Sequence, residues 1–254
     1  MRKVSLKSIG LIIVAAIFLF IMADYVNACS MIAFQNLLDD SLQAIVNKPV
    51  EALVVVAILP AIIEEFLFRG MIYRGIANKS NKKIAIIISA LLFAFLHMNF
   101  NQMCYAFVMG LVFAIVIYLT DNLSVSILLH MLFNAFTVII TCFEKSNAIQ
   151  AILQCNIAGY TLFNPSLTDT QGKIEISLLI IGGLIAILSA VIAGWLILLI
   201  AKTEKTTETT INNKNILKDN DNIFKNNEKW KPDLRFFAGS GVCILIAILY
   251  EILL

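Results

Sequence analysis

Long apolar runs separated by short polar segments dominate the chain. A membrane-spanning helix needs roughly 20 consecutive, mainly apolar residues. On that scale the pattern predicts seven spans: Leu6–Tyr25, Val50–Ala77, Ile84–Phe100, Met103–Thr120, Leu123–Phe143, Ile176–Ala201 and Arg235–Leu254. Apolar residues also recur at helical spacing over Cys29–Asn47, which is typical of an interfacial amphipathic helix. Ser146–Phe163 is apolar only in patches and is predicted to be a loop with a surface helix.

This pattern predicts an all-α fold, a polytopic membrane helical bundle of about seven transmembrane helices plus one interfacial helix. Residues 1–49 hold the first span and the interfacial segment, and residues 50–143 form a helical core. Residues 144–201 form an extracytoplasmic loop and the sixth span. Residues 202–234 are predicted to be a solvated hydrophilic linker, because Lys, Glu, Asp, Asn and Thr dominate them. Residues 235–254 form the last span.

Lysine and arginine sort to alternate ends of the predicted spans, which sets the orientation. The positive residues concerned are Arg2, Lys3 and Lys7 before the first span, and Arg74, Lys79, Lys82 and Lys83 after the second. We therefore predict a multi-pass protein of the cell membrane with a cytoplasmic N-terminus. Asp121 is the exception, because it stands alone in a predicted inside turn.

The composition agrees with this class. Hydrophobic residues make up 60% of the 254 and charged residues 14%, whereas soluble domains carry about 25% charged residues. A net charge of +2 provides no global field for nucleic acid. The lipid bilayer is therefore the expected surrounding, and nucleic acid is not an expected partner.

Two features of the ends and loops leave alternatives open. Arg2, Lys3, an apolar run and Val26-Asn27-Ala28 resemble a signal peptide, and Cys29 then invites a lipoprotein interpretation. We favour a retained first helix. The five cysteines include no CxxC pair, which disfavours a disulfide framework, although Cys142 and Cys155 could form a bridge outside.

The second predicted span contains charges where the bilayer makes them costly. Glu65 and Arg69 lie four residues apart, so they share a helix face and can form an ion pair. Glu64 points about 100° away around the helix and needs a pocket, a water or a partner from another helix. Pro60 removes a backbone hydrogen bond one turn earlier and should bend the helix or open space beside Glu64.

Both histidines of the chain lie in predicted spans. His97 lies near the outer end of the third span. His130 lies one turn before Asn134, so an imidazole and an amide share one face and could both donate to one oxygen. The alternative for Asn134 is a hydrogen bond between helices, and that for Glu64, Glu65 and Arg69 is a structural charge cluster.

Together these residues indicate hydrolysis without a covalent nucleophile. Glu64 and His97 could hold and deprotonate a water, while His130 and Asn134 could form an oxyanion hole. We find no serine or cysteine spaced to pair with either histidine, which disfavours covalent catalysis. Glu64, His97 and His130 could alternatively ligate zinc, although HExxH spacing is absent.

The motifs resemble those of the CAAX-processing and bacteriocin-processing (CPBP) intramembrane endopeptidases, also called the Abi family. The resemblance covers roughly Leu53–Phe143 and rests on three motifs in order: Glu64-Glu65-x-x-x-Arg69, Phe93-x-x-x-His97 and His130-x-x-x-Asn134. Each motif alone is weak, but three in order on three apolar spans are specific.

The resemblance implies a function for each of these positions. Glu64 would activate the attacking water with His97 as its partner. Glu65 and Arg69 would support the site, and His130 and Asn134 would stabilise the oxyanion. The family implies a glutamate-dependent mechanism without a cofactor, with zinc as the older alternative.

The expected substrate is a hydrophobic peptide or a membrane protein, such as a bacteriocin-like or signalling peptide in a bacterium. Two other functions stay open. One is a non-catalytic immunity or regulatory protein that binds membrane partner proteins. The other is a transporter or proton pathway, although the inverted repeats of transporters are not evident.

Overall fold

The computed structural model describes residues 3–34, 47–169 and 171–216. The predicted C-terminal span, Arg235–Leu254, lies outside these residues. Most of the predicted interfacial helix and the linker beyond residue 216 also lie outside them.

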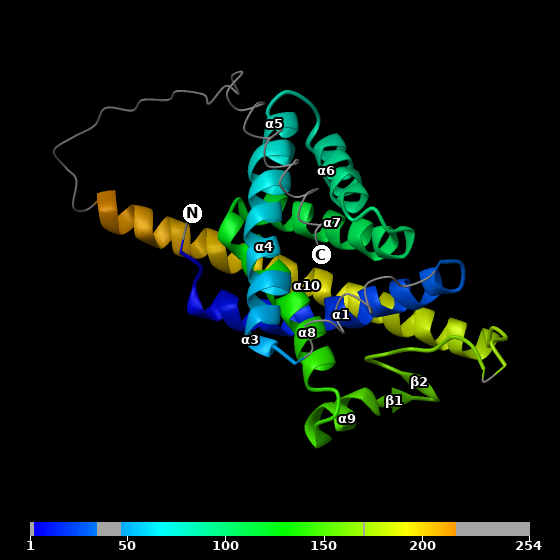
Figure 1. Cartoon of the computed structure of the whole chain (residues 1–254). Coiled ribbons are helices and arrows are strands. Elements are labelled where there is room, and N and C mark those ends of the chain that lie inside the picture. Colours follow the sequence, from blue (N-terminus) through cyan, green and yellow to red (C-terminus); the bar gives the residue numbers. More distant parts are fainter. Residues whose placement is uncertain (1–2, 35–46, 170, 217–254) are drawn as a thin grey trace.

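The described chain is almost entirely helical, as predicted, and its helices pack into a bundle (Figure 1). In chain order the elements are α1 (Leu6–Met31), α3 (Pro49–Ala52), η1 (Leu53–Ile58), α4 (Leu59–Glu64), η2 (Glu65–Tyr73), α5 (Arg74–Ala77), α6 (Lys82–Leu96), α7 (Phe100–Thr120), α8 (Leu123–Cys142), α9 (Asn147–Leu153), β1 (Asn156–Ile157), β2 (Tyr160–Thr161) and α10 (Ile176–Ile216). The elements η1 and η2 are π-helices, and they make the second predicted span a continuous helical run of mixed geometry.

Four predicted spans are single helices that are long and apolar enough to cross a membrane. They are Leu6–Met31, Phe100–Thr120, Leu123–Cys142 and Ile176–Thr207. The helix α6 has 15 residues and spans only about 22 Å at 1.5 Å per residue. It is therefore shorter than the roughly 30 Å hydrocarbon core.

Local sequence explains where the central helices begin and end. The side chains of Asn81, Asn99 and Asn122 accept hydrogen bonds from the backbone N–H two residues on, at 2.8, 3.0 and 3.1 Å, and so cap α6, α7 and α8. The predicted third span, Ile84–Phe100, extended too far. The chain turns at Met98, whose φ of 47° is left-handed, and Phe100 already belongs to α7.

The predicted boundary at residue 201 is not a structural break. The helix α10 continues to Ile216, and Glu204 within the predicted linker is buried. Its carboxylate accepts hydrogen bonds from Ser8 Oγ at 2.6 Å and from Asn122 Nδ2 at 2.9 Å. These bonds join α10 to the start of α1 and to the α7–α8 turn. The isolated charge of Asp121 in that turn is also explained, because it pairs with Arg74 at 3.0 Å.

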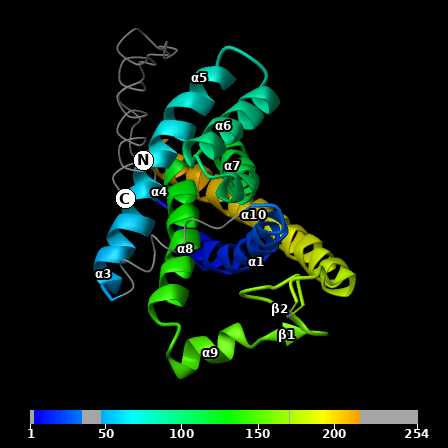
Figure 2. The ribbon, with the colours of Figure 1, turned by 45° about the vertical axis from the view of Figure 1, so that its right-hand side comes forward.

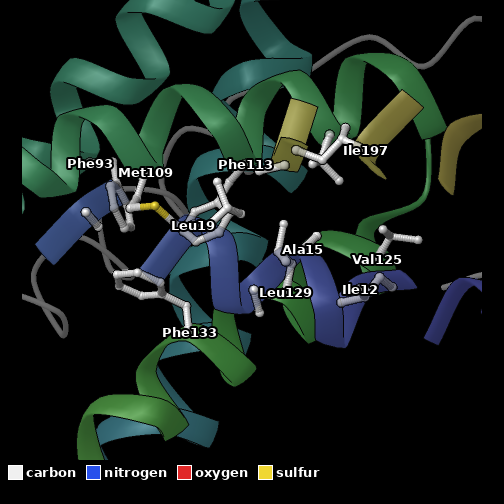
Figure 3. Close-up of a cluster of buried hydrophobic side chains, with 14 of the residues drawn as sticks. Ile12, Ala15, Leu19, Phe93, Met109, Phe113, Val125, Leu129, Phe133 and Ile197 are labelled. Atoms are coloured by element: carbon white, nitrogen blue, oxygen red, sulfur yellow. The ribbon is translucent and has the colours of Figure 1, made fainter. Parts of the chain in front are cut away.

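The core lies where α1 packs along α10 and against α7 and α8. Figure 3 shows Ile12, Ala15 and Leu19 of α1 facing Phe113 of α7 and Leu129 of α8. Small residues of α1 are almost fully buried, which lets the helix backbones approach closely as in other membrane bundles. Gly110 of α7 likewise lies against Ala90 of α6, because a Cβ there would meet Ala90 Cα at 3.0 Å.

A short antiparallel hairpin and α9 close one end of the bundle, opposite α5 and the start of α6 (Figure 2). The surface helix predicted in Ser146–Phe163 is thereby confirmed. Cys142 and Cys155 are not bridged. Tyr160 of the hairpin is 1% exposed and fits, with Tyr25 of α1, against Gly182 of α10. The hydroxyl of Tyr25 donates to the carbonyl of Leu179 at 3.0 Å.

Replacing Gly182 with alanine is expected to lower the free energy of unfolding by about 1–3 kcal/mol, because the new methyl group overpacks this contact. Its Cβ would overlap the Tyr160 ring and lie 2.8 Å from Tyr25 Cε2. Gly194→Ala on the same helix is the matched control. A Cβ there meets nothing within 4 Å, so only the gain in helix propensity of about 0.5–1 kcal/mol should remain. Thermal unfolding in detergent measures both, and equal effects would contradict this packing.

Candidate active site

The predicted ion pair within the second span is confirmed. Arg69 Nη1 lies 2.9 Å from Glu65 Oε1, and both side chains are fully buried. Glu65 begins the π-helix η2, whose wider turn still keeps these two residues adjacent. π-helical turns inside helices occur frequently at functional sites.

The guanidinium of Arg69 also binds groups from neighbouring helices. Its Nη2 donates to the Gly110 carbonyl of α7 at 2.9 Å. Its central carbon lies 4.4 Å from the ring centroid of Phe93 and 5.3 Å from that of Phe113. These cation–π contacts supplement the carboxylate in holding a charge that has no access to water. Arg69 therefore joins η2 to α6 and α7.

His130 lies between the two glutamates. Its Nδ1 donates to Glu65 Oε1 at 3.1 Å, and its Nε2 lies 3.9 Å from Glu64 Oε2. The ring stacks on Phe113, with centroids 4.7 Å apart and planes at 18°. Of the pocket, the water and the partner helix expected for Glu64, the structure provides a partner helix, because His130 of α8 lies beside it. The sequence pairs His130 with Asn134 instead, because helix periodicity shows only neighbours on the same helix.

Ser126 is a member of this network that the sequence analysis missed. Its hydroxyl donates to Glu65 Oε2 at 2.6 Å, and the side chain is fully buried. Ser126 lies one turn before His130, so the statement that no serine is spaced with a histidine was wrong. The spacing of four among Ser126, His130 and Asn134 was the available signal. The hydroxyl nevertheless binds Glu65 rather than the imidazole.

His97 caps the C-terminus of α6 at the edge of the same cluster. Its Nδ1 lies 3.0 Å from the Phe93 carbonyl oxygen and donates to it, because a carbonyl can only accept. The Phe93 ring lies 5.2 Å from the His97 ring and 5.7 Å from the His130 ring. One aromatic side chain therefore contacts both histidines. His97 is half-buried, whereas His130 is buried.

Asn134 binds a backbone carbonyl of the facing helix. Its Nδ2 donates to the Val56 oxygen at 3.1 Å. In an α-helix that oxygen would accept the N–H of residue 60, which Pro60 lacks. Val56 lies instead in the π-helix η1, where hydrogen bonds run to the fifth residue on. The amide of Asn134 therefore joins α8 to the π-helical turn directly before the proline-bearing helix α4.

Asn134→Ala is expected to lower the free energy of unfolding by about 1–3 kcal/mol, because the Val56 carbonyl loses a donor in an apolar setting. In a Pro60→Ala background the loss should be smaller, since residue 60 then has an N–H to offer. A double-mutant cycle of thermal unfolding in detergent measures this coupling. Additive effects would mean that the bond is independent of the proline.

Among the residues that the structure describes, no group of three His, Cys, Asp or Glu side chains is placed to hold a metal ion. The zinc alternative would require Glu64, His97 and His130 to converge. Instead, His130 Nδ1 is bound to Glu65 and His97 Nδ1 to the Phe93 carbonyl. Each imidazole therefore has only Nε2 left for any further interaction.

Residues 46–136 match the family model described as type II CAAX prenyl endopeptidase Rce1-like. This segment holds all six predicted site residues. The motif-bearing core is therefore similar to this family. The resemblance drawn from the three motifs is thereby confirmed.

Two bacterial relatives agree with the Rce1-like match. The chain is 34% identical over 116 residues to the "Membrane-embedded CAAX protease MroQ" of Staphylococcus aureus (strain USA300), covering 43% of this chain and 47% of the relative. It is 31% identical over 87 residues to the "Putative membrane peptidase YdiL" of Bacillus subtilis (strain 168), covering 34% and 36%. The matched regions thus span less than half of either relative. No solved structure gives a significant match.

The names of these two relatives and the long apolar helices of the chain both indicate a membrane protein. At the level of the family, the match is to membrane proteases.

Proposed function

We propose that the protein is an intramembrane endopeptidase that hydrolyses a peptide bond in a hydrophobic or membrane-anchored peptide. The observation that carries the proposal is the position of His130 between Glu64 and Glu65, buried against the rings of Phe93 and Phe113. A structural ion pair between Glu65 and Arg69 would not need a second carboxylate, Glu64, beside Nε2 of His130.

Glu64 is the proposed general base. Its carboxylate takes a proton from a water, whose oxygen attacks the substrate carbonyl carbon. The resulting tetrahedral oxyanion then collapses, the C–N bond breaks, and Glu64 returns the proton to the leaving amine. His97 is the proposed partner that orients the water. Its Nδ1 donates to Phe93, so in the neutral ring Nε2 remains as an acceptor.

His130 is the proposed oxyanion donor, acting through Nε2. Glu65 keeps Nδ1 protonated by accepting from it, so a proton on Nε2 requires the imidazolium form. Two carboxylates, one guanidinium and one imidazolium give a cluster with no net charge. Ser126 and Arg69 position Glu65, and Glu65 in turn positions His130.

Asn134 is the second proposed oxyanion donor. Its amide has two N–H groups, and the bond to Val56 uses one of them. The other is available to the oxyanion if the substrate carbonyl lies near Val56. This proposal gives Asn134 two functions, binding the Val56 carbonyl of the facing helix and binding the intermediate.

The proposal is tested with purified protein in detergent and a library of apolar 20-residue peptides, with products identified by mass spectrometry. The parent should cleave members of the library at defined bonds. His97→Ala should cleave them about 100-fold more slowly, which is the lower range for loss of acid–base assistance. Gln150→Ala, on the exposed surface helix α9, should cleave as the parent does. Equal rates for His97→Ala and the parent would reject the mechanism. No cleavage by any variant would favour the non-catalytic alternative.

A further inference from the structure

A cavity of about 260 Å³ lies away from the glutamate–histidine cluster, at the end of the bundle where η2, α5, α6 and α7 meet. Its polar and aromatic lining comes from Tyr73, Arg74, Asn78, Lys82, Tyr118 and Asp121. The mechanism proposed above uses none of these residues. This cavity therefore needs an explanation of its own.

The charges in the cavity favour an anion. Arg74 and Lys82 outnumber Asp121, and Lys79 and Lys83 lie in the adjoining turn and first helical turn. Arg74 uses one donor for Asp121, at 3.0 Å, out of the five that a guanidinium has. Lys82 Nζ lies 5.5 Å above the Tyr118 ring, which holds the ammonium at the cavity wall.

The start of α6 adds to this positive potential. A helix N-terminus carries partial positive charge and is normally complemented by acidic residues. The first turn of α6 holds no acidic residue and begins with Lys82 and Lys83 instead. Phosphate groups bind readily at such helix ends. The backbone and the side chains therefore favour the same class of ligand.

The surroundings favour a lipid over a free anion. Tyr118 of α7 lines the cavity and is 48% exposed, and tyrosine is common at membrane interfaces, where its ring contacts lipid and its hydroxyl reaches water. In the orientation predicted from the basic residues, this end lies at the cytoplasmic leaflet, where anionic lipids concentrate.

We propose that this cavity binds the phosphate of an anionic phospholipid headgroup, with Arg74 and Lys82 as its donors and the positive end of α6 nearby. The lipid would hold the end of η2 against α6 and α7. Because η2 begins at Glu65, the headgroup would clamp the helix that carries the site. The binding proposal itself does not depend on proteolytic activity.

The test titrates the full chain in a neutral maltoside detergent with dihexanoyl phosphatidylglycerol and follows the thermal unfolding midpoint. The parent should show saturable stabilisation. Arg74→Gln/Lys82→Gln should raise the apparent dissociation constant about tenfold or more, because two charge-assisted bonds are lost. Lys145→Gln/Lys173→Gln removes the same charge from exposed loops at the opposite end and should titrate as the parent does. Ala77→Phe fills the cavity without changing charge and should also weaken binding.

Two further titrations identify the source of the phosphate. Dihexanoyl phosphatidylcholine should bind more weakly than phosphatidylglycerol if the net negative charge matters. Inorganic phosphate should stabilise only at much higher concentration, because it lacks the acyl chains that contact the membrane face of the protein. Equal binding of inorganic phosphate and phosphatidylglycerol would overturn the lipid assignment. Identical titrations for the parent and both cavity variants, each folded by circular dichroism, would overturn the site itself.

Discussion

Glu65→Gln is expected to lower the free energy of unfolding by about 3–5 kcal/mol, because it leaves a buried charge without its counter-ion. Arg69 is fully buried and binds Glu65 at 2.9 Å. The same glutamate oxygen accepts from His130, and the other accepts from Ser126. One substitution therefore weakens three interactions, two of which join η2 to α8. Thermal or dodecyl-sulfate unfolding in mixed micelles measures the loss.

The neighbouring residue gives the matched control. Glu64→Gln makes the same chemical change one position earlier, where the carboxylate lies 3.9 Å from His130 Nε2. We expect a smaller loss of stability than for Glu65→Gln, because Arg69 keeps its counter-ion Glu65 in this variant. Glu65→Gln/Arg69→Gln should be more stable than Glu65→Gln alone, because no uncompensated charge remains. Equal losses for the two single variants would show that Glu65 is not the structural carboxylate.

The contrast between the two glutamates shows what sequence can and cannot specify. The spacing of four between Glu65 and Arg69 was sufficient to predict their ion pair, because both partners belong to one helix. The same periodicity separated Glu64 from that pair. It could not predict that His130 lies between the two carboxylates, since that depends on how α8 packs against η2. Ser126 escaped notice for the same reason.

Asn134 illustrates a second limit. Its position one turn after His130 predicted two donors side by side. Its amide instead binds the Val56 carbonyl of the facing helix, one turn before a proline that lies 74 residues earlier in the chain than Asn134. The positions of Asn134 and Pro60 are both visible in the sequence. Only the packing of α8 on η1 and α4 shows that they lie close together. The end of α10 could not be predicted for the same reason. Glu204 binds Ser8 and Asn122 from other elements, and the sequence does not show that these residues meet.

Substitutions of the two glutamates should also have different effects on the cleavage rate. Glu64→Gln is expected to lower the cleavage rate about 10²–10⁴-fold, because glutamine is isosteric but cannot take a proton from water. The substrate is held by apolar contacts that this change leaves intact, so the effect should fall on kcat rather than KM. The measurement is single-turnover cleavage of a peptide selected from the library.

Stability and activity measured together distinguish this mechanism from a structural cluster. Glu64→Gln should remain folded and inactive, whereas the surviving folded fraction of Glu65→Gln should keep measurable activity, since its carboxylate only positions His130. Glu64→Asp offers a partial rescue, because the shorter side chain keeps the base but moves it away from the attacking water. If Glu64→Gln and Glu64→Asp both cleave like the parent, Glu64 is not the base. If both lose stability as Glu65→Gln does, the two glutamates form one structural unit and the division of function between them is wrong.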